Sequence, residues 1–303
     1  MGEPRPIEEI IALAERRWPG LELRRKSTHE ACGPCPICRQ ATTDGFVVFE
    51  DSGYLCRKCG AKGWIDENDP HPPSREQLLE IRVRALERKQ EEHERRLTAL
   101  EQMARCKDHV TYHQMLDDDD REYWHSQGML DATIDKYLLG ICYSCPTDSQ
   151  HRPSYTIPVI NGGKLVNIRH RLVTDSGDRY RPHAPGLGAT LFNADNVYAD
   201  APEIMVVEGE KKSLVVGQYG FLTVGTMGKA GFQPAWAKRF DKFKRVLVAL
   251  DPDAEDQAQQ VAGLFGGRGW VVPMPCKPDD LFTKYHGTPA MLQRFVELAR
   301  RIH

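Results

Sequence analysis

Two short stretches decide the fold of this chain, 203-EIMVVEGEKK-212 and 245-RVLVALDPD-253. Each begins as an apolar run that predicts a buried strand, and each ends on acidic residues. Further elements are predicted around them: helices at 213–219, 235–242, 254–264 and 291–302, and strands at 221–224 and 270–272. Strands that alternate with helices in this way form a parallel sheet. The sequence therefore predicts an α/β fold for this region.

Three carboxylates, those of Glu208, Asp251 and Asp253, fall at the ends of the predicted strands. The carboxyl ends of parallel strands form the ligand-binding edge of such a sheet, so we expect these side chains to face one site. Carboxylate oxygens bind Mg²⁺ or Mn²⁺, and the ion in turn binds phosphate oxygens. Acids at strand ends also cap helices, but their recurrence at two strand ends favours the metal site.

A second metal site is predicted near the N-terminus by two cysteine pairs, Cys35-x-x-Cys38 and Cys56-x-x-Cys59. This spacing is typical of a four-cysteine zinc site, in which each turn offers two thiolates and the two turns complete a tetrahedron. His29 and Cys32 lie nearby but rank lower because they lack such a turn. A module this small needs structural zinc to fold. Cysteines kept for metal indicate a reducing compartment, and we expect a cytoplasmic protein.

Composition divides the chain into a zinc-binding domain at 1–70, a helical linker at 71–107 and a catalytic domain at 108–303. The middle of the linker has almost no apolar residue, as is typical of a helix that bridges domains. The catalytic domain comprises a basic N-terminal subdomain (108–200), the parallel sheet (201–276) and a C-terminal tail (277–303). Net charge is only −2, so any basic surface must be local. No apolar run is long enough to span a bilayer, and we expect no membrane partner.

These blocks resemble the DnaG-type DNA primases of phages and plasmids. The glutamate Glu208 and the pair Asp251-x-Asp253 resemble the acidic motifs of the TOPRIM domain, which primases share with topoisomerases and some nucleases. The family often continues its Asp-x-Asp with a small residue and a glycine, whereas this chain has 254-AED-256. The cysteine pattern resembles the primase zinc-binding domain, and 155–193 resembles the basic subdomain. The resemblance implies an α+β chain: a zinc ribbon, a helical linker and a primase core with a basic subdomain and a TOPRIM sheet.

The resemblance also implies a set of ligand-binding residues. Arginines of the basic subdomain would face nucleoside triphosphate and template, and the candidates are Arg169, Arg171 and Arg181. Lysines near the acidic edge are candidate phosphate partners, namely Lys211, Lys212 and Lys229. Asp279 and Asp280 resemble a third acidic block of the family, although an exposed Pro-Asp turn is an alternative.

The implied activity is synthesis of short RNA primers on single-stranded DNA by Mg²⁺-dependent nucleotidyl transfer. Glu208 would bind a metal ion or accept a proton from the attacking hydroxyl. The expected partners are template DNA, ribonucleoside triphosphates and a replicative helicase on a separate chain, because 225-GTMGK-229 is too short for a P-loop. Two alternatives stay open: a TOPRIM nuclease, which the basic subdomain disfavours, and a non-catalytic nucleic-acid-binding module.

Overall fold

The chain packs as two compact units, Met1–Arg95 and Arg96–His303, here called the N-terminal and C-terminal units. A computed structural model describes residues 5–39, 44–65, 75–173, 180–227 and 231–302. Each unit is described by itself. In the described part of the chain, no helix combines the length and the apolar character that crossing a membrane requires.

The N-terminal unit is an antiparallel sheet with one helix packed on it, α1 (Ile7–Arg17). The five strands follow one another in sequence order: β1 (Arg24–Arg25), β2 (Glu30–Gly33), β3 (Phe46–Phe49), β4 (Gly53–Cys56) and β5 (Lys62–Trp64). Trp18 meets Phe46 and Tyr54 edge-on, with ring centroids 5.4 and 5.3 Å apart. These aromatic rings and the apolar face of α1 form the small core of the unit.

The helix expected in the linker is α2 (Arg75–Arg105), so the boundary between the two units lies within it. The polar middle of α2 carries exposed ion pairs one turn apart. Arg84 pairs with Glu80 at 3.2 Å, and Arg95 pairs with Glu91 at 3.4 Å. Such pairs stabilise a helix by only about 0.2–0.5 kcal/mol each. Most of the stability of α2 must therefore come from its ends. Ala85 packs into the core of the N-terminal unit, and Ala99 and Met103 pack into the C-terminal unit.

The C-terminal unit begins with three short helices, α3 (Asp108–Gln114), α4 (Asp118–Ser126) and α5 (Asp131–Lys136). The side chain of Asp117 caps α4 by accepting a hydrogen bond from the backbone N–H of Asp120 at 2.8 Å. A four-stranded antiparallel sheet follows: β6 (Gly140–Cys142), β7 (Ser154–Asn161), β8 (Lys164–Leu172) and β9 (Tyr180–Pro182). Gly162 and Gly163 form the predicted turn between β7 and β8 with φ of 59° and 70°, a backbone conformation that glycine adopts without strain.

The second sheet of this unit has the strand order β11-β10-β12-β13-β14. Its strands are β10 (Glu203–Glu208), β11 (Thr223–Thr226), β12 (Arg245–Ala249), β13 (Gly269–Val271) and β14 (Arg300–Arg301). The first four are parallel, as predicted, and β14 is antiparallel to β13. The other elements are η1 (Ala194–Tyr198), α6 (Gly209–Gly217), η2 (Pro234–Phe240), η3 (Pro252–Ala254), α7 (Glu255–Gly263), η4 (Gly266–Arg268), α8 (Asp280–Thr283) and α9 (Pro289–Glu297).

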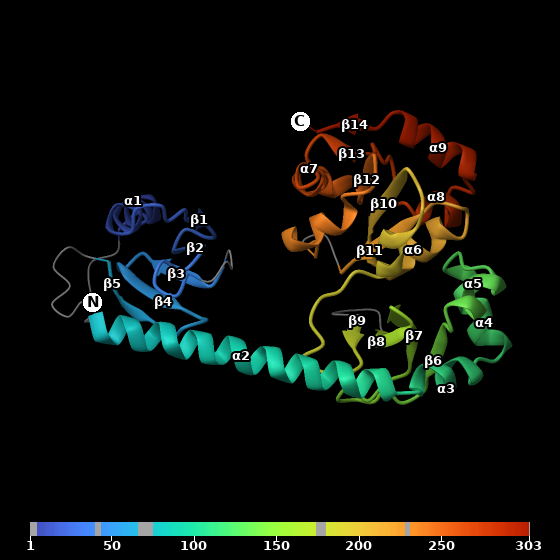
Figure 1. Cartoon of the computed structure of the whole chain (residues 1–303), viewed down its shortest axis with the longest axis horizontal. Helices are drawn as coiled ribbons and strands as arrows, with labels where there is room; N and C mark the ends of the chain where they lie inside the picture. Colours follow the sequence, from blue (N-terminus) through green and yellow to red (C-terminus); the bar gives the residue numbers. More distant parts are fainter. Residues whose placement is uncertain (1–4, 40–43, 66–74, 174–179, 228–230, 303) are drawn as a thin grey trace. The chain divides into compact units, whose positions relative to one another are not determined.

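Helices cover both faces of this sheet (Figure 1). Met205 and Val207 of β10 pack with residues of α6, α8 and α9, whereas their neighbours Ile204 and Val206 pack with residues of η2 and α7. Two predicted helices differ from the observed elements. The segment expected to be a helix at 235–242 is the 3₁₀ helix η2, and the closing helix expected at 291–302 ends at Glu297. The last residues instead extend the sheet, because β13 offers them an unpaired edge.

Candidate functional site

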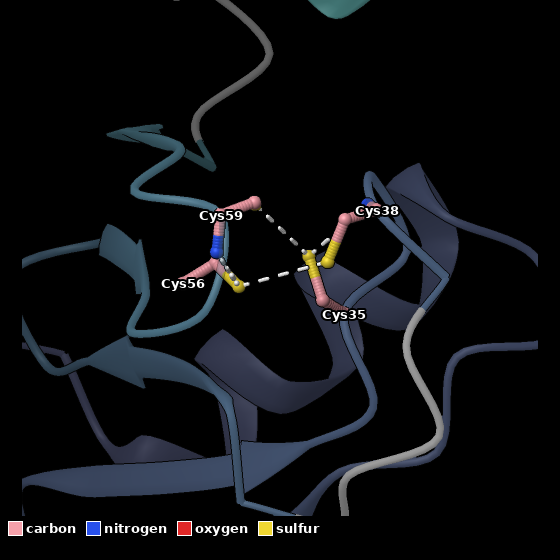
Figure 2. Close-up of side chains that lie close together, drawn as sticks. All are labelled: Cys35, Cys38, Cys56 and Cys59. Carbon is pink, nitrogen blue, oxygen red and sulfur yellow. Dashed lines mark hydrogen bonds between the residues drawn. The ribbon is translucent and has the colours of Figure 1, made fainter. Parts of the chain in front are cut away.

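The four predicted zinc ligands meet in the N-terminal unit. The thiols of Cys35, Cys38, Cys56 and Cys59 all lie within 4.8 Å of one another (Figure 2). Two Sγ–Sγ distances are 3.9 Å (Cys35 to Cys59) and 4.0 Å (Cys38 to Cys56). A tetrahedral zinc ion with bonds of about 2.3 Å separates its sulfur ligands by about 3.8 Å. The four cysteines therefore fit a structural zinc ion. His29 bonds instead to Glu50 at 2.6 Å, and Cys32 is outside the cluster.

Local backbone geometry prepares the cysteines for a cation. The N–H of Cys38 donates to Cys35 Sγ at 3.5 Å, and the N–H of Cys59 donates to Cys56 Sγ at 3.4 Å. Hydrogen bonds from Cys35 and Cys59 lower the pKa of Cys56, and the same proton sharing raises the pKa of Cys35. Crowded thiols cannot all ionise without a positive ion between them. Zn²⁺ supplies that charge and holds all four as thiolates.

The candidate catalytic site of the C-terminal unit is the carboxyl edge of its parallel sheet. Glu208 is the last residue of β10, and Asp251 lies two residues after the end of β12, directly before η3. Asp251 is buried, with a relative exposure of 5%, whereas Asp253 is exposed. The edge also receives Asp279, from the loop after β13, which is 2% exposed. Two of the predicted acids, Asp251 and Asp279, are thus carboxylates withdrawn from water.

Lysines accompany both buried acids. The Nζ of Lys212 lies 3.1 Å from Asp251 Oδ1, and the Nζ of Lys277 lies 3.3 Å from Asp251 Oδ2. The negative charge of Asp251 raises the pKa of Lys277. The Nζ of Lys211 lies 2.6 Å from Asp279 Oδ2. Lys211 and Lys212 were predicted as phosphate partners, and the structure places them in contact with the acidic edge. The positive charges of Lys211 and Lys212 favour the ionised form of Asp279.

The pKa of Asp279 reflects a balance between burial and the charges of the neighbouring lysines. Burial acts to raise its pKa, but the charges of Lys211 and Lys212 and the hydrogen bond from Lys211 outweigh burial, so its pKa lies below the ordinary value. Its Oδ1 is buried and has no hydrogen-bond partner among the described residues. A buried carboxylate oxygen of this kind is a ligand position that a cation would satisfy. Asp280, the second member of the predicted third acidic block, pairs instead with Lys284 at 2.9 Å along α8.

The predicted magnesium ligands are not gathered as tightly as the cysteines. Among the described residues, the clusters whose potential ligand atoms lie within 4.8 Å of one another are the four cysteines and the group Cys106, Asp108 and His183. Glu208, Asp251 and Asp253 are not such a cluster, and their role as metal ligands stays a prediction. Lys229 lies outside the described residues.

The predicted arginine Arg169 reaches the acidic edge through a residue that sequence reasoning missed. Arg169 is on β8, and its Nε lies 3.1 Å from Oε1 of Glu210, in the first turn of α6. Both residues are buried, at 9% and 6% exposure. The signal in the sequence was the second glutamate of Glu208-Gly-Glu210, but its partner could not be inferred because it comes from the other sheet. This ion pair connects the antiparallel sheet to the candidate catalytic edge.

The other two predicted arginines lie on neighbouring strands. Arg171 of β8 donates to Tyr123 Oη and, at 2.8 Å, to Gln127 Oε1, and it stacks over the Tyr123 ring at 5.6 Å. Tyr123 stacks in turn on Tyr155, with 3.4 Å between ring centroids. Arg181 is on β9, and its buried Nε has no hydrogen-bond partner in the described part of the chain. Arg171 is therefore held in place by protein groups, whereas Arg181 keeps a donor for another acceptor.

Comparison with known proteins places this fold among solved primase structures. The primase of Aquifex aeolicus, with its zinc-binding and RNA polymerase domains, aligns over 98% of this chain and 86% of its own, with a TM-score of 0.54 and 18% identity. The DnaG primase catalytic domain bound to single-stranded DNA aligns over 68% and 83%, with a TM-score of 0.53 and 16% identity. The RNA polymerase domain of Mycobacterium tuberculosis DnaG, in complex with double-stranded DNA, aligns over 69% and 81%, with a TM-score of 0.52 and 18% identity.

Comparison by sequence found neither a matching family model nor a matching curated protein. The structural likeness is therefore one of fold at low identity. It spans both units, and the four-cysteine cluster lies in the unit where a zinc-binding domain is expected. This chain has the fold of the zinc-binding and catalytic-core domains of DnaG-type primases.

Proposed function

We propose that this chain is a DNA primase that joins ribonucleoside triphosphates into short primers on single-stranded DNA. The observation that carries the proposal is the Arg169–Glu210 pair. It ties an arginine-bearing strand to the acidic edge of a sheet with the TOPRIM pattern. A nucleotidyl transferase needs cations for the triphosphate and carboxylates for metal at one place, and this pair supports that arrangement.

Basic residues of the two sheets would divide this work. Arg181, on β9, is proposed to contact phosphate oxygens of the triphosphate or template, because an arginine fork suits that acceptor. Lys212 and Lys277 both contact Asp251. Their ammonium groups would be available to phosphate oxygens of a triphosphate if Asp251 held a metal ion instead. The stack of Tyr123 on Tyr155 holds Arg171 in place on β8.

Mg²⁺ or Mn²⁺ would be held by Glu208, Asp251 and Asp253, and it would neutralise charge on the triphosphate and on the departing pyrophosphate. The donor set fits, because carboxylate oxygens are the ligands that these hard ions prefer. The buried Oδ1 of Asp279, which has no hydrogen-bond partner among the described residues, supports a cation at this edge. Whether Glu208 binds metal or accepts the proton of the attacking 3′-hydroxyl separates two versions of the same proposal.

The zinc-bearing N-terminal unit is assigned to template choice rather than to bond formation. All proposed triphosphate contacts come from the C-terminal unit, and the cysteine cluster belongs to the other. A replicative helicase on a separate chain would deliver the single-stranded template. We place the protein in the cytoplasm, where four free thiols remain available for zinc.

The test is primer synthesis by the full chain on a single-stranded template with radiolabelled ribonucleotides and Mg²⁺. Wild type should produce short, template-dependent RNA. Asp251→Asn should abolish synthesis, because it removes the charge but keeps the size of a proposed metal ligand. Asp256→Asn is the matched control, since Asp256 is an exposed acid in the first turn of α7 that is not a proposed metal ligand.

The assay also separates the alternatives. Template degradation by wild type with no primer, lost in Asp251→Asn, would establish the nuclease. Template binding without synthesis or cleavage would establish a non-catalytic binding module. Synthesis by Asp251→Asn at the wild-type rate would place the metal site elsewhere.

A further inference from the structure

A second cluster of metal-ligand side chains lies in the C-terminal unit, apart from the acidic edge. Cys106 follows the last residue of α2, Asp108 begins α3, and His183 follows β9. One ligand atom from each lies within 4.8 Å of the others. Two segments of the chain, 106–108 and the residue after β9, thus bring a thiol, a carboxylate and an imidazole to one point.

The geometry of this cluster suits a tetrahedral ion. His183 Nε2 lies 3.4 Å from Asp108 Oδ2. A tetrahedral zinc ion with Zn–N and Zn–O bonds of about 2.1 Å separates those two atoms by about 3.4 Å. The side chain of Asp108 is 50% exposed and that of His183 is 14% exposed, so an ion can reach the cluster from solvent.

Hydrogen-bonding groups on the far side of the ring fix the orientation of His183. His183 Nδ1 lies 2.9 Å from Nε2 of His170, and His170 Nδ1 lies 2.9 Å from Ser154 Oγ. His170 and Ser154 are fully buried. If protons sit on Nδ1 of both rings, His183 donates to His170, His170 donates to Ser154, and His183 Nε2 presents its lone pair to the cluster. Metal-bound histidines almost always donate their second N–H in this way.

The backbone also fixes the ligands. The N–H of His183 donates to Asn167 Oδ1 at 3.2 Å, and Asn167 is buried in β8. The N–H of Cys106 donates to the carbonyls of Gln102 and Met103 in the last turn of α2. Met103 packs with Leu165 and Ile168 of β8. The ligand-bearing segments are therefore held together by a packed core before any ion binds.

From this juxtaposition we propose that Cys106, Asp108 and His183 form a second metal site, which binds Zn²⁺ through one thiolate, one imidazole and one carboxylate, with water in the fourth position. A thiolate and an imidazole select a borderline-soft ion such as Zn²⁺ over Mg²⁺ or Ca²⁺. The ion displaces the thiol proton of Cys106 to solvent as it binds. It would fasten the end of α2 to the hairpin of β8 and β9, which carries Arg169, Arg171 and Arg181.

The same chain provides a matched comparison for a plain histidine–aspartate contact. His125 Nε2 lies 3.1 Å from Asp131 Oδ1, and no cysteine joins this pair in a described metal-ligand cluster. Both side chains are partly exposed. If the His183 site were only such a contact, it should bind metal no better than His125 and Asp131 do.

The experiment uses the full chain with its four-cysteine site filled with Zn²⁺, so that added Co²⁺ reports on the second site. Co²⁺ should bind one further equivalent and give a thiolate-to-cobalt absorption band. Asp108→Asn and His183→Gln should weaken Co²⁺ binding about tenfold or more, and Cys106→Ser should remove the thiolate band. Asp131→Asn and Cys276→Ser are the controls and should behave as wild type. Zinc content after reloading, measured by elemental analysis, should be two ions per chain in wild type and one in the three ligand variants.

Absence of the thiolate band in wild type, or a zinc content of one, would overturn the second site. So would wild-type Co²⁺ affinity in Asp108→Asn, whose half-exposed side chain can be changed with little risk to folding. An equal loss of Co²⁺ affinity in Asp131→Asn would show that the ion binds nonspecifically to surface side chains, and this too would overturn the second site. None of these readouts depends on primer synthesis, so the experiment tests the second metal site independently of the proposed function.

Discussion

Replacing Lys211 by methionine should destabilise the C-terminal unit at neutral pH, because it removes the cation next to a buried carboxylate. Lys211 Nζ lies 2.6 Å from Asp279, whose side chain is 3% exposed. Methionine keeps the length and apolar stem of lysine. The perturbation therefore isolates the charge of Lys211 rather than its packing.

The magnitude follows from burial. Removing one partner of a fully buried ion pair costs about 3–5 kcal/mol. The side chain of Lys211 is 24% exposed, and Lys212 also lowers the pKa of Asp279, so part of the compensation survives. We expect a loss of about 2 kcal/mol in the free energy of unfolding at neutral pH. Lys284→Met is the control, because Lys284 is 67% exposed in its pair with Asp280, so loss of that pair should cost far less stability.

The loss should depend on pH with a defined sign. In the wild type the pKa of Asp279 is lowered, so its ionisation stabilises the fold above its unfolded pKa of about 3.9, and this contribution disappears as pH falls through the folded pKa. In Lys211→Met burial is opposed by less positive charge, so the pKa of Asp279 rises. Protonation then relieves the buried charge, and the deficit of the variant should shrink between about pH 7.5 and about pH 5.

The assay is urea unfolding of the full chain followed by circular dichroism. The transition of the C-terminal unit is the one that does not move when Cys35 is changed to serine. Adding Asp279→Asn to Lys211→Met should recover much of the loss, because the uncompensated charge is gone. The reasoning would be refuted if Lys211→Met lost no more unfolding free energy than Lys284→Met. It would also be refuted if that loss did not change with pH or when Asp279→Asn was added.

Three further outcomes are expected. Changing Cys35 and Cys56 to serine together should remove the zinc of the four-cysteine site, as elemental analysis will show, and should impair new primer starts more than extension of an annealed primer. Glu210→Gln should lower the unfolding free energy by about 2 kcal/mol, because Arg169 loses its buried countercharge; a stability equal to wild type in urea would contradict this. Arg181→Ala should reduce the salt dependence of single-stranded DNA binding by about one phosphate contact, with the slope of log affinity against log salt as the measurement.

The zinc site and the course of the parallel sheet could be predicted because their signals are local. A C-x-x-C turn sets two thiols side by side whatever surrounds it, and two such turns define the cage of Cys35, Cys38, Cys56 and Cys59. The apolar runs that became β10 and β12 alternate their side chains between two helix-covered faces, so both runs are apolar throughout. Parallel strands align their carboxyl ends, and this placed Glu208 and Asp251 at one edge.

The secondary structure of the last residues was predicted less well, because it depends on a neighbouring strand and not on a local signal. The amphipathic pattern of 291–302 is helical throughout, yet α9 ends at Glu297 and β14 follows. The pattern records which side chains are apolar, but it does not record that β13 has a free edge nearby. Pairing with that edge satisfies backbone groups of the last residues, and this gain outweighs another half turn of helix.

The sequence by itself determined which residues are charged and which strand or helix carries them, but not which charge meets which. Lys211 and Lys212 are adjacent in the chain, yet one contacts Asp279 and the other Asp251. Arg169 and Glu210 come from different sheets, and Cys106 and His183 are brought together only where the end of α2 packs against β8. These contacts depend on how two sheets and their helices interlock through buried side chains, which is a property of the assembled core. Local propensity acts over a few residues, so only the tertiary structure could decide them.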